Sequence, residues 1–119
     1  MLGPLYHWSP RERLASIKRS GLITGKPNIQ GSAYENHVTG EEEHYFQDSI
    51  SFSPDPATAW NYSHGCWKTS GVFDLWMVVL DPTDEVRVQP SWGSVIHEVR
   101  VHNRIPKKRL VWIGERVAA

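Results

Sequence analysis

The pattern of hydrophobic and polar positions predicts a first strand and helix, a long irregular stretch, and then strands around a second helix. We expect the first strand over 5–8 and the first helix over 10–20, with Ser9 as its cap. Gly21 is a typical residue just beyond a helix end. Glycine, proline and asparagine recur through 24–47 and break any periodicity, which predicts a long loop.

The second half of the chain is richer in strand patterns. Residues 49–53 alternate polar and apolar, which predicts a strand with Ile50 and Phe52 pointing inward. Asp55 and Pro56 then suit the cap and first position of a second helix that ends near residue 64. The further strands are expected over 72–80, 85–88, 94–102 and 110–113. Helices early and strands late indicate an α+β fold rather than a parallel doubly wound sheet.

Composition and charge narrow the class of protein. The chain has 119 residues, 39% of them hydrophobic, and six tryptophans, so a single domain over 1–119 can build a sizeable core. Thirteen basic and thirteen acidic residues leave no net charge, which argues against a non-specific nucleic-acid binder. The charge is uneven, because 41–43 is acidic and 100–116 is rich in basic residues; such runs are mostly solvated surface.

Cysteine content and hydropathy bear on location. The single cysteine, Cys66, excludes an intrachain disulfide and suits a reducing compartment. No apolar leader follows Met1, and the longest apolar run, 75–80, is too short to cross a bilayer. We therefore expect a cytoplasmic protein with no membrane partner.

Several familiar chemical motifs are missing, among them a glycine-rich phosphate loop, CxxC, HExxH and GxSxG. Six histidines raise the possibility of zinc. However, His97 and His102 are five apart on one expected strand and so point to opposite faces. His64 and Cys66 alone do not complete a tetrahedral ligand set, so we expect no metal. Cys66 also lacks an evident base partner and is not expected to be a nucleophile.

Three segments carry a more specific signal through their order. They are Leu5-Tyr6-His7-Trp8-Ser9 with a helix ending Ser20-Gly21-Leu22, then the strand and helix from Ile50 to Tyr62, then His97-Glu98-Val99-Arg100-Val101 with Arg104-Ile105-Pro106 downstream. Together they resemble the ADP-ribosyltransferase fold of the histidine-tyrosine-glutamate type. The resemblance implies an α+β fold with a split mixed or antiparallel sheet, two short helices and a long loop. It also implies NAD as cofactor and a small effector of bacterial or phage origin.

The resemblance assigns roles to individual residues. His7 matches the histidine that holds the adenosine ribose of NAD. Tyr62 and Phe52 match the aromatic clamp on nicotinamide, with Trp60 as a substitute. Glu98 matches the catalytic glutamate, which stabilises positive charge on the ribose. Two serines, Ser51 and Ser53, can bond the cofactor.

Two departures from the family pattern have consequences. Trp8 stands where the family has a small residue, which would narrow the cofactor cleft. Ile96 stands two residues before Glu98, so the second carboxylate of arginine-modifying toxins is absent and arginine is disfavoured as the acceptor.

The same residues allow plainer interpretations. His7 can be a core histidine bonded to the backbone, and Ser53 can be a helix cap. Glu98 shares a strand face with Arg100 and His102, a pattern that a solvated strand would also show. Tyr62 and Phe52 can be core aromatics.

Three functions follow. The first is NAD-dependent ADP-ribosyl transfer to a protein or nucleic-acid acceptor, which needs an open cleft between the strands of His7 and Glu98. The second is a catalytically inactive effector on the same fold that binds a host protein, with Trp8 or another bulky side chain filling the cleft. The third resembles RNA 2′-phosphotransferases and needs arginines converging on His7; only Arg11 and Arg13 lie near His7 in the sequence, and helix numbering predicts that both face solvent.

Overall fold

The structure is a computed structural model that describes residues 3–24, 49–67, 70–88 and 97–118. Its strands are β1 (Pro4–Pro10), β2 (Ile50–Phe52), β3 (Gly71–Val79), β4 (Val86–Val88), β5 (Val99–Val101) and β6 (Val111–Ala118). Its α-helices are α1 (Leu14–Ser20) and α4 (Pro56–Asn61). The 3-10 helices within the described ranges are η1 (Arg11–Arg13), η2 (His64–Trp67) and η4 (Lys107–Arg109). No helix in these residues is long and apolar enough to span a membrane.

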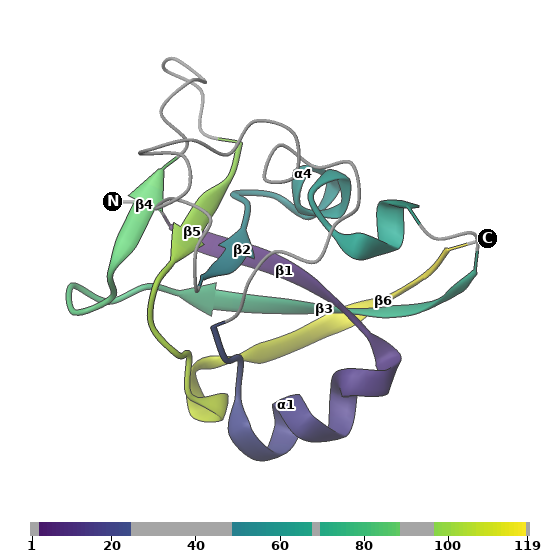
Figure 1. Cartoon of the computed structure of the whole chain (residues 1–119), viewed down its shortest axis with the longest axis horizontal. Coiled ribbons are helices and arrows are strands. Elements are labelled where there is room, and N and C mark those ends of the chain that lie inside the picture. The colour runs from purple at the N-terminus through teal and green to yellow at the C-terminus, as the bar shows by residue number, and fades with distance from the viewer. Residues whose placement is uncertain (1–2, 25–48, 68–69, 89–96, 119) are drawn as a thin grey trace.

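The strands form two three-stranded antiparallel sheets, ordered β1-β3-β6 and β2-β5-β4. One antiparallel bridge joins the sheets: Tyr6 N donates to Ser53 O at 2.9 Å, and Ser53 N donates to Tyr6 O at 3.0 Å. Figure 1 shows α1 below the long sheet and α4 above it. The predicted α+β class is confirmed, and every strand pairing among the described residues is antiparallel.

The main core lies between the two sheets and α1. It collects Leu5 of β1, Ile17 of α1, and the buried faces of β2, β3 and β5. Ile50 and Phe52 are both buried, so the predicted alternation of β2 is confirmed. The most hydrophobic strand, β3, is central in its sheet, as its burial on both faces requires.

The start of the first helix differs from the prediction. Ser9 does not cap it, because β1 continues to Pro10 and Ser9 is paired with Asp74 of β3. The chain therefore passes through η1 before α1 begins at Leu14. Pairing with a long central strand has overridden the local cap signal.

The second helix begins as predicted. Asp55 is its cap, with the Asp55 carboxylate accepting from Thr58 N at 2.8 Å and Pro56 in the first turn. The helix ends at Asn61, earlier than expected, and η2 follows.

Strand lengths differ at the C-terminus. β6 runs to Ala118 rather than residue 113, because β3 offers pairing partners down to Gly71. The expected strand over 94–102 is present as Val99–Val101, and residues 94–96 lie outside the described residues. The predicted long loop also lies outside them, apart from Thr24.

Candidate functional site

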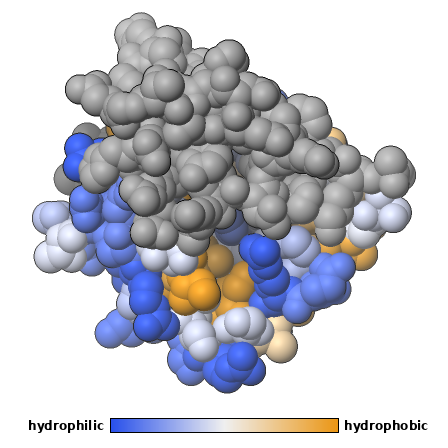
Figure 2. Space-filling view, in the orientation of Figure 1, coloured by the Kyte–Doolittle hydropathy of each residue, from blue (hydrophilic) through white to orange (hydrophobic). Residues whose placement is uncertain are grey.

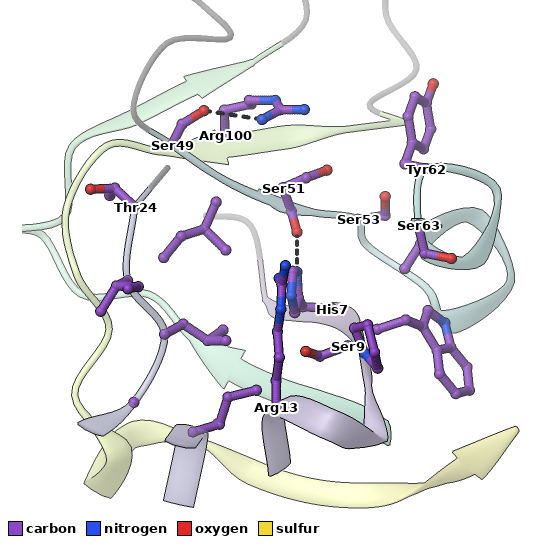
Figure 3. Close-up of a pocket in the computed structure, with 18 of the residues that line it drawn as sticks. His7, Ser9, Arg13, Thr24, Ser49, Ser51, Ser53, Tyr62, Ser63 and Arg100 are labelled. Carbon is purple, nitrogen blue, oxygen red and sulfur yellow. Dashed lines mark hydrogen bonds between the residues drawn. The ribbon is translucent and has the colours of Figure 1, made fainter. Parts of the chain in front are cut away.

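A cleft of about 490 Å³ opens where the two sheets meet, with α1 and α4 at its sides. Its polar lining includes His7, Ser9, Arg13, Ser51, Tyr62 and Arg100 (Figure 3). These side chains come from β1, η1, β2, the end of α4 and β5. The split between the sheets thus brings side chains from distant parts of the chain to one cleft. His7 and Arg100, for example, are 93 positions apart in the sequence.

His7 is held in a defined tautomer. Its Nδ1 lies 2.7 Å from the carbonyl oxygen of Ser51, so Nδ1 carries the hydrogen and Nε2 is left as an acceptor. Burial, and then the positive charges of Arg13 and Arg100, lower the His7 pKa to about 4, although the bond to Ser51 opposes this. The backbone bond of the plainer interpretation is present, and the neutral ring also lines the cleft.

A chain of hydrogen-bonded polar side chains links β2 to β5 at the cleft wall. The Ser51 hydroxyl donates to Glu98 Oε2, and Arg100 Nη2 lies 3.2 Å from the same oxygen. Arg100 Nη1 donates in turn to Ser49 Oγ at 3.1 Å (Figure 3). The interpretation of Glu98 on a solvated strand is wrong, since the Glu98 and Arg100 side chains are only 3% and 5% exposed. Glu98 and Arg100 are therefore covered on this face and paired with each other.

The cleft brings together four of the six predicted site residues: His7, Ser51, Ser53 and Tyr62. Glu98 lies one side chain behind the wall, bonded to Ser51. Phe52 lies in the core with its ring centroid 5.6 Å from that of His7, because strand alternation points it away from its serine neighbours. Phe52 therefore supports the His7 ring, and its placement provides no surface for a nicotinamide.

The aromatic residues of α4 have separate positions. Tyr62 is half-buried on the cleft, where burial and then the negative charge of Glu98 raise its pKa to about 12. It is therefore a neutral phenol at neutral pH. Trp60 is buried in a second cluster with Phe73 and does not line the cleft, so it is no substitute for Tyr62 there.

Trp8 does not fill the cleft, although it contributes to the lining. Its Nε1 donates to the carbonyl oxygen of Pro56 at 2.8 Å, and its ring packs edge-on against Trp60 at 5.2 Å. The indole is thus fixed against α4.

Sequence reasoning did not assign Ser9 or Arg100 to the site, and it placed Arg13 near His7 but expected it to face solvent. The hydroxyls of Ser9 and Ser53 are buried on the cleft and have no hydrogen-bond partner among the described residues. Such groups normally find a partner, so the cleft offers donors to a ligand or to water. A signal for Arg13 existed, since it stands four residues before core-facing Ile17 and so shares its helix face.

The described residues contain no group of three or more His, Cys, Asp or Glu side chains placed to hold a metal ion. In comparisons with known proteins, the chain matches no family model and no curated protein. The chemistry of the cleft is therefore judged from its own lining. That lining holds His7, Arg13, Arg100 and several hydroxyls, and no carboxylate among the described residues, which suits an anionic ligand rich in hydroxyl groups.

The depressed pKa of His7 predicts a pH-dependent stability. An unfolded imidazole takes up a proton near pH 6.5, whereas the folded one does so only near pH 4. Stability should therefore fall as pH drops from about 6.5 to about 4, because the unfolded state binds the proton first. Urea unfolding at intervals across this window should show a smaller fall for His7→Gln. Equal falls in both proteins would contradict the assignment.

Proposed function

We propose that the chain binds NAD in this cleft and transfers ADP-ribose to a macromolecular acceptor. The proposal rests on one arrangement: His7 on the cleft wall is linked through Ser51 to the buried carboxylate of Glu98, across the split between the sheets. The resemblance of the three sequence segments to ADP-ribosyltransferases supports the same assignment. Neither Trp8 nor another bulky side chain of the described residues fills the cleft, which favours this function over the inactive effector.

The cleft chemistry matches the parts of NAD. Neutral His7 offers Nε2 as an acceptor to a ribose hydroxyl. Arg13 and Arg100 face the cleft and suit the two phosphates. Tyr62 offers an aromatic ring on which nicotinamide can stack.

From behind the cleft wall, the negative charge of Glu98 would stabilise the positive charge that develops when the bond between ribose and nicotinamide breaks. Nicotinamide leaves with the bonding electron pair, so positive charge develops on the ribose ring. A carboxylate already held in place lowers that barrier without reorganising. The acceptor nucleophile then bonds the ribose carbon and releases its proton to water. Ser51 and Arg100 position the carboxylate, because both contact the same oxygen.

NAD titration by calorimetry tests the proposal. Wild type should bind saturably, and His7→Ala should bind at least about tenfold more weakly, since it loses a buried acceptor. Glu98→Gln should still bind NAD but should release nicotinamide at least roughly 100-fold more slowly than wild type. The control is Arg87→Ala on β4, an exposed residue outside the cleft lining, which should behave as wild type. No saturable binding by folded wild type would refute the NAD site.

A second function is favoured by one observation. Arg13 and Arg100 both line the cleft, and the positive charge of each lowers the pKa of His7. This convergence is what chemistry on an RNA 2′-phosphate requires. Incubation with NAD and a 2′-phosphorylated RNA oligonucleotide should then remove the phosphate from the RNA, and Arg13→Ala should lose that activity. If nicotinamide is released but the RNA keeps its 2′-phosphate, this second function is refuted and ADP-ribosyl transfer remains.

A further inference from the structure

Five exposed cations gather beside the cleft from two segments far apart in the chain. They are Lys18, Arg19, Arg104, Lys107 and Lys108. The segments are held together where Leu22 N donates to Ile105 O at 2.9 Å and Ile105 N donates to Leu22 O at 3.0 Å. Neither 14–24 nor 104–114 contains an acidic residue. None of the five forms an ion pair with another residue in the described ranges. Figure 2 shows hydrophilic surface along its lower edge, where Figure 1 places α1.

An exposed aromatic ring adjoins these cations. Trp112, at the start of β6, is 46% exposed and lines a shallow groove with Lys18. Its Nε1 donates to the buried carboxylate of Asp74 at 2.9 Å, so one edge of the ring is anchored and the orientation is set. The two carboxylates of this groove, Asp74 and Glu115, are each paired with Arg11 at 2.8 Å. Arg11 carries one positive charge against these two carboxylates, so the charge of Lys18 makes the groove neutral overall.

We propose that this face binds a single-stranded nucleic acid, with phosphates on the five cations and a base stacked on Trp112. Interleaved cations and an oriented aromatic ring are what single strands require, because every base has a stacking face and every linkage carries a charge. The neutral net charge of the chain does not oppose this, since these five cations come from two segments without acidic residues that are bonded to each other. An acidic protein would use the cations but would have no need of a stacked ring.

The position of this face relates the nucleic-acid binding to the proposed reaction. The other side of α1 and of the turn after it, including Ile17 and Leu22, lines the cleft. A nucleic-acid strand bound to this face would lie across α1 from the cleft where NAD would react. The inference that the strand is the acceptor rests on the proposed function, whereas the binding itself does not.

Fluorescence anisotropy with a labelled single-stranded oligonucleotide of about 12 nucleotides, as DNA and as RNA and without NAD, tests the binding. With one phosphate neutralised by each of the five cations, the logarithm of the affinity should fall with the logarithm of salt at a slope of about −3.5. Lys107→Glu should weaken binding at least about fivefold. The matched control is Arg87→Glu, which makes the same charge change at an exposed site on β4, in the β2-β5-β4 sheet. It should leave the affinity for the oligonucleotide unchanged.

The role of Trp112 is tested by two substitutions. Trp112→Ala should weaken binding by about five- to tenfold, whereas Trp112→Phe should retain most of it, because phenylalanine still stacks. Both variants lose the hydrogen bond to Asp74, so a merely structural role would make them equally defective. Circular dichroism and melting curves confirm that each variant is folded.

Three results would overturn the inference: no binding at low salt, no effect of Lys107→Glu, or displacement of the oligonucleotide by polyglutamate as readily as by unlabelled strand. The last would assign the face to an acidic protein. Oligonucleotide binding without NAD binding would keep this inference and remove the proposed function. NAD binding without oligonucleotide binding would keep the proposed function and remove this inference.

Discussion

Replacing Gly21 by alanine is expected to destabilise the fold by about 3–5 kcal/mol. Gly21 has φ +77° and ψ −163°, a backbone conformation that residues with a side chain rarely adopt. An added Cβ would also lie 2.1 Å from the carbonyl oxygen of Ile105 and 2.7 Å from the amide nitrogen of Lys107. Both neighbours are backbone atoms, so no side-chain rotation relieves the clash.

Thermal and urea unfolding measure this effect, and Gly114→Ala is the matched control. Gly114 lies on β6 with nothing within 4 Å of an added Cβ, so its substitution should cost less than about 1 kcal/mol. Similar melting temperatures for Gly21→Ala and wild type would show that the junction between 21 and 105 is adaptable. Because that junction forms both one cleft wall and the basic face, Gly21→Ala should weaken NAD and oligonucleotide binding together.

The local parts of the fold could be predicted from the sequence. The alternation around Ile50 and Phe52 and the cap at Asp55 both depend on neighbours within a few positions, and the structure contains both. The α+β class followed from the order of such local elements. The position of Ser9 depends on a partner 65 residues away, Asp74, and no local signal reports that pairing.

The candidate site could be predicted only in part, for the same reason. His7, Ser51 and Tyr62 were found because their segments match a known order, and they do line one cleft. Arg100 was not assigned to the site, and Arg13 was expected to face solvent, because their relation to the cleft arises only when the sheets pack. The basic run over 100–116 was seen in the sequence and interpreted as solvated surface, but no local pattern shows that Lys18 and Arg19 lie beside it.

Replacing Arg100 by leucine is expected to cost about 3–5 kcal/mol, because it leaves the carboxylate of Glu98 buried without its cation. The Arg100 and Glu98 side chains are 5% and 3% exposed, so water cannot take the place of the lost partner. The control is Arg87→Leu, which removes one partner of an exposed pair with Glu85 at 3.9 Å and should cost less than about 1 kcal/mol. Urea unfolding of both variants gives the comparison.

A double substitution identifies the cause of that loss. Adding Glu98→Gln to Arg100→Leu removes the stranded charge and should recover a large part of the stability, since replacing both members of a buried pair is often close to neutral. Equal instability of the single and double variants would instead mean that Arg100 acts through packing and its bond to Ser49. A stable double variant also separates stability from ligand binding. If it is folded yet binds NAD far more weakly than Glu98→Gln alone, then Arg100 contacts the ligand from the cleft wall as well as holding Glu98 in place.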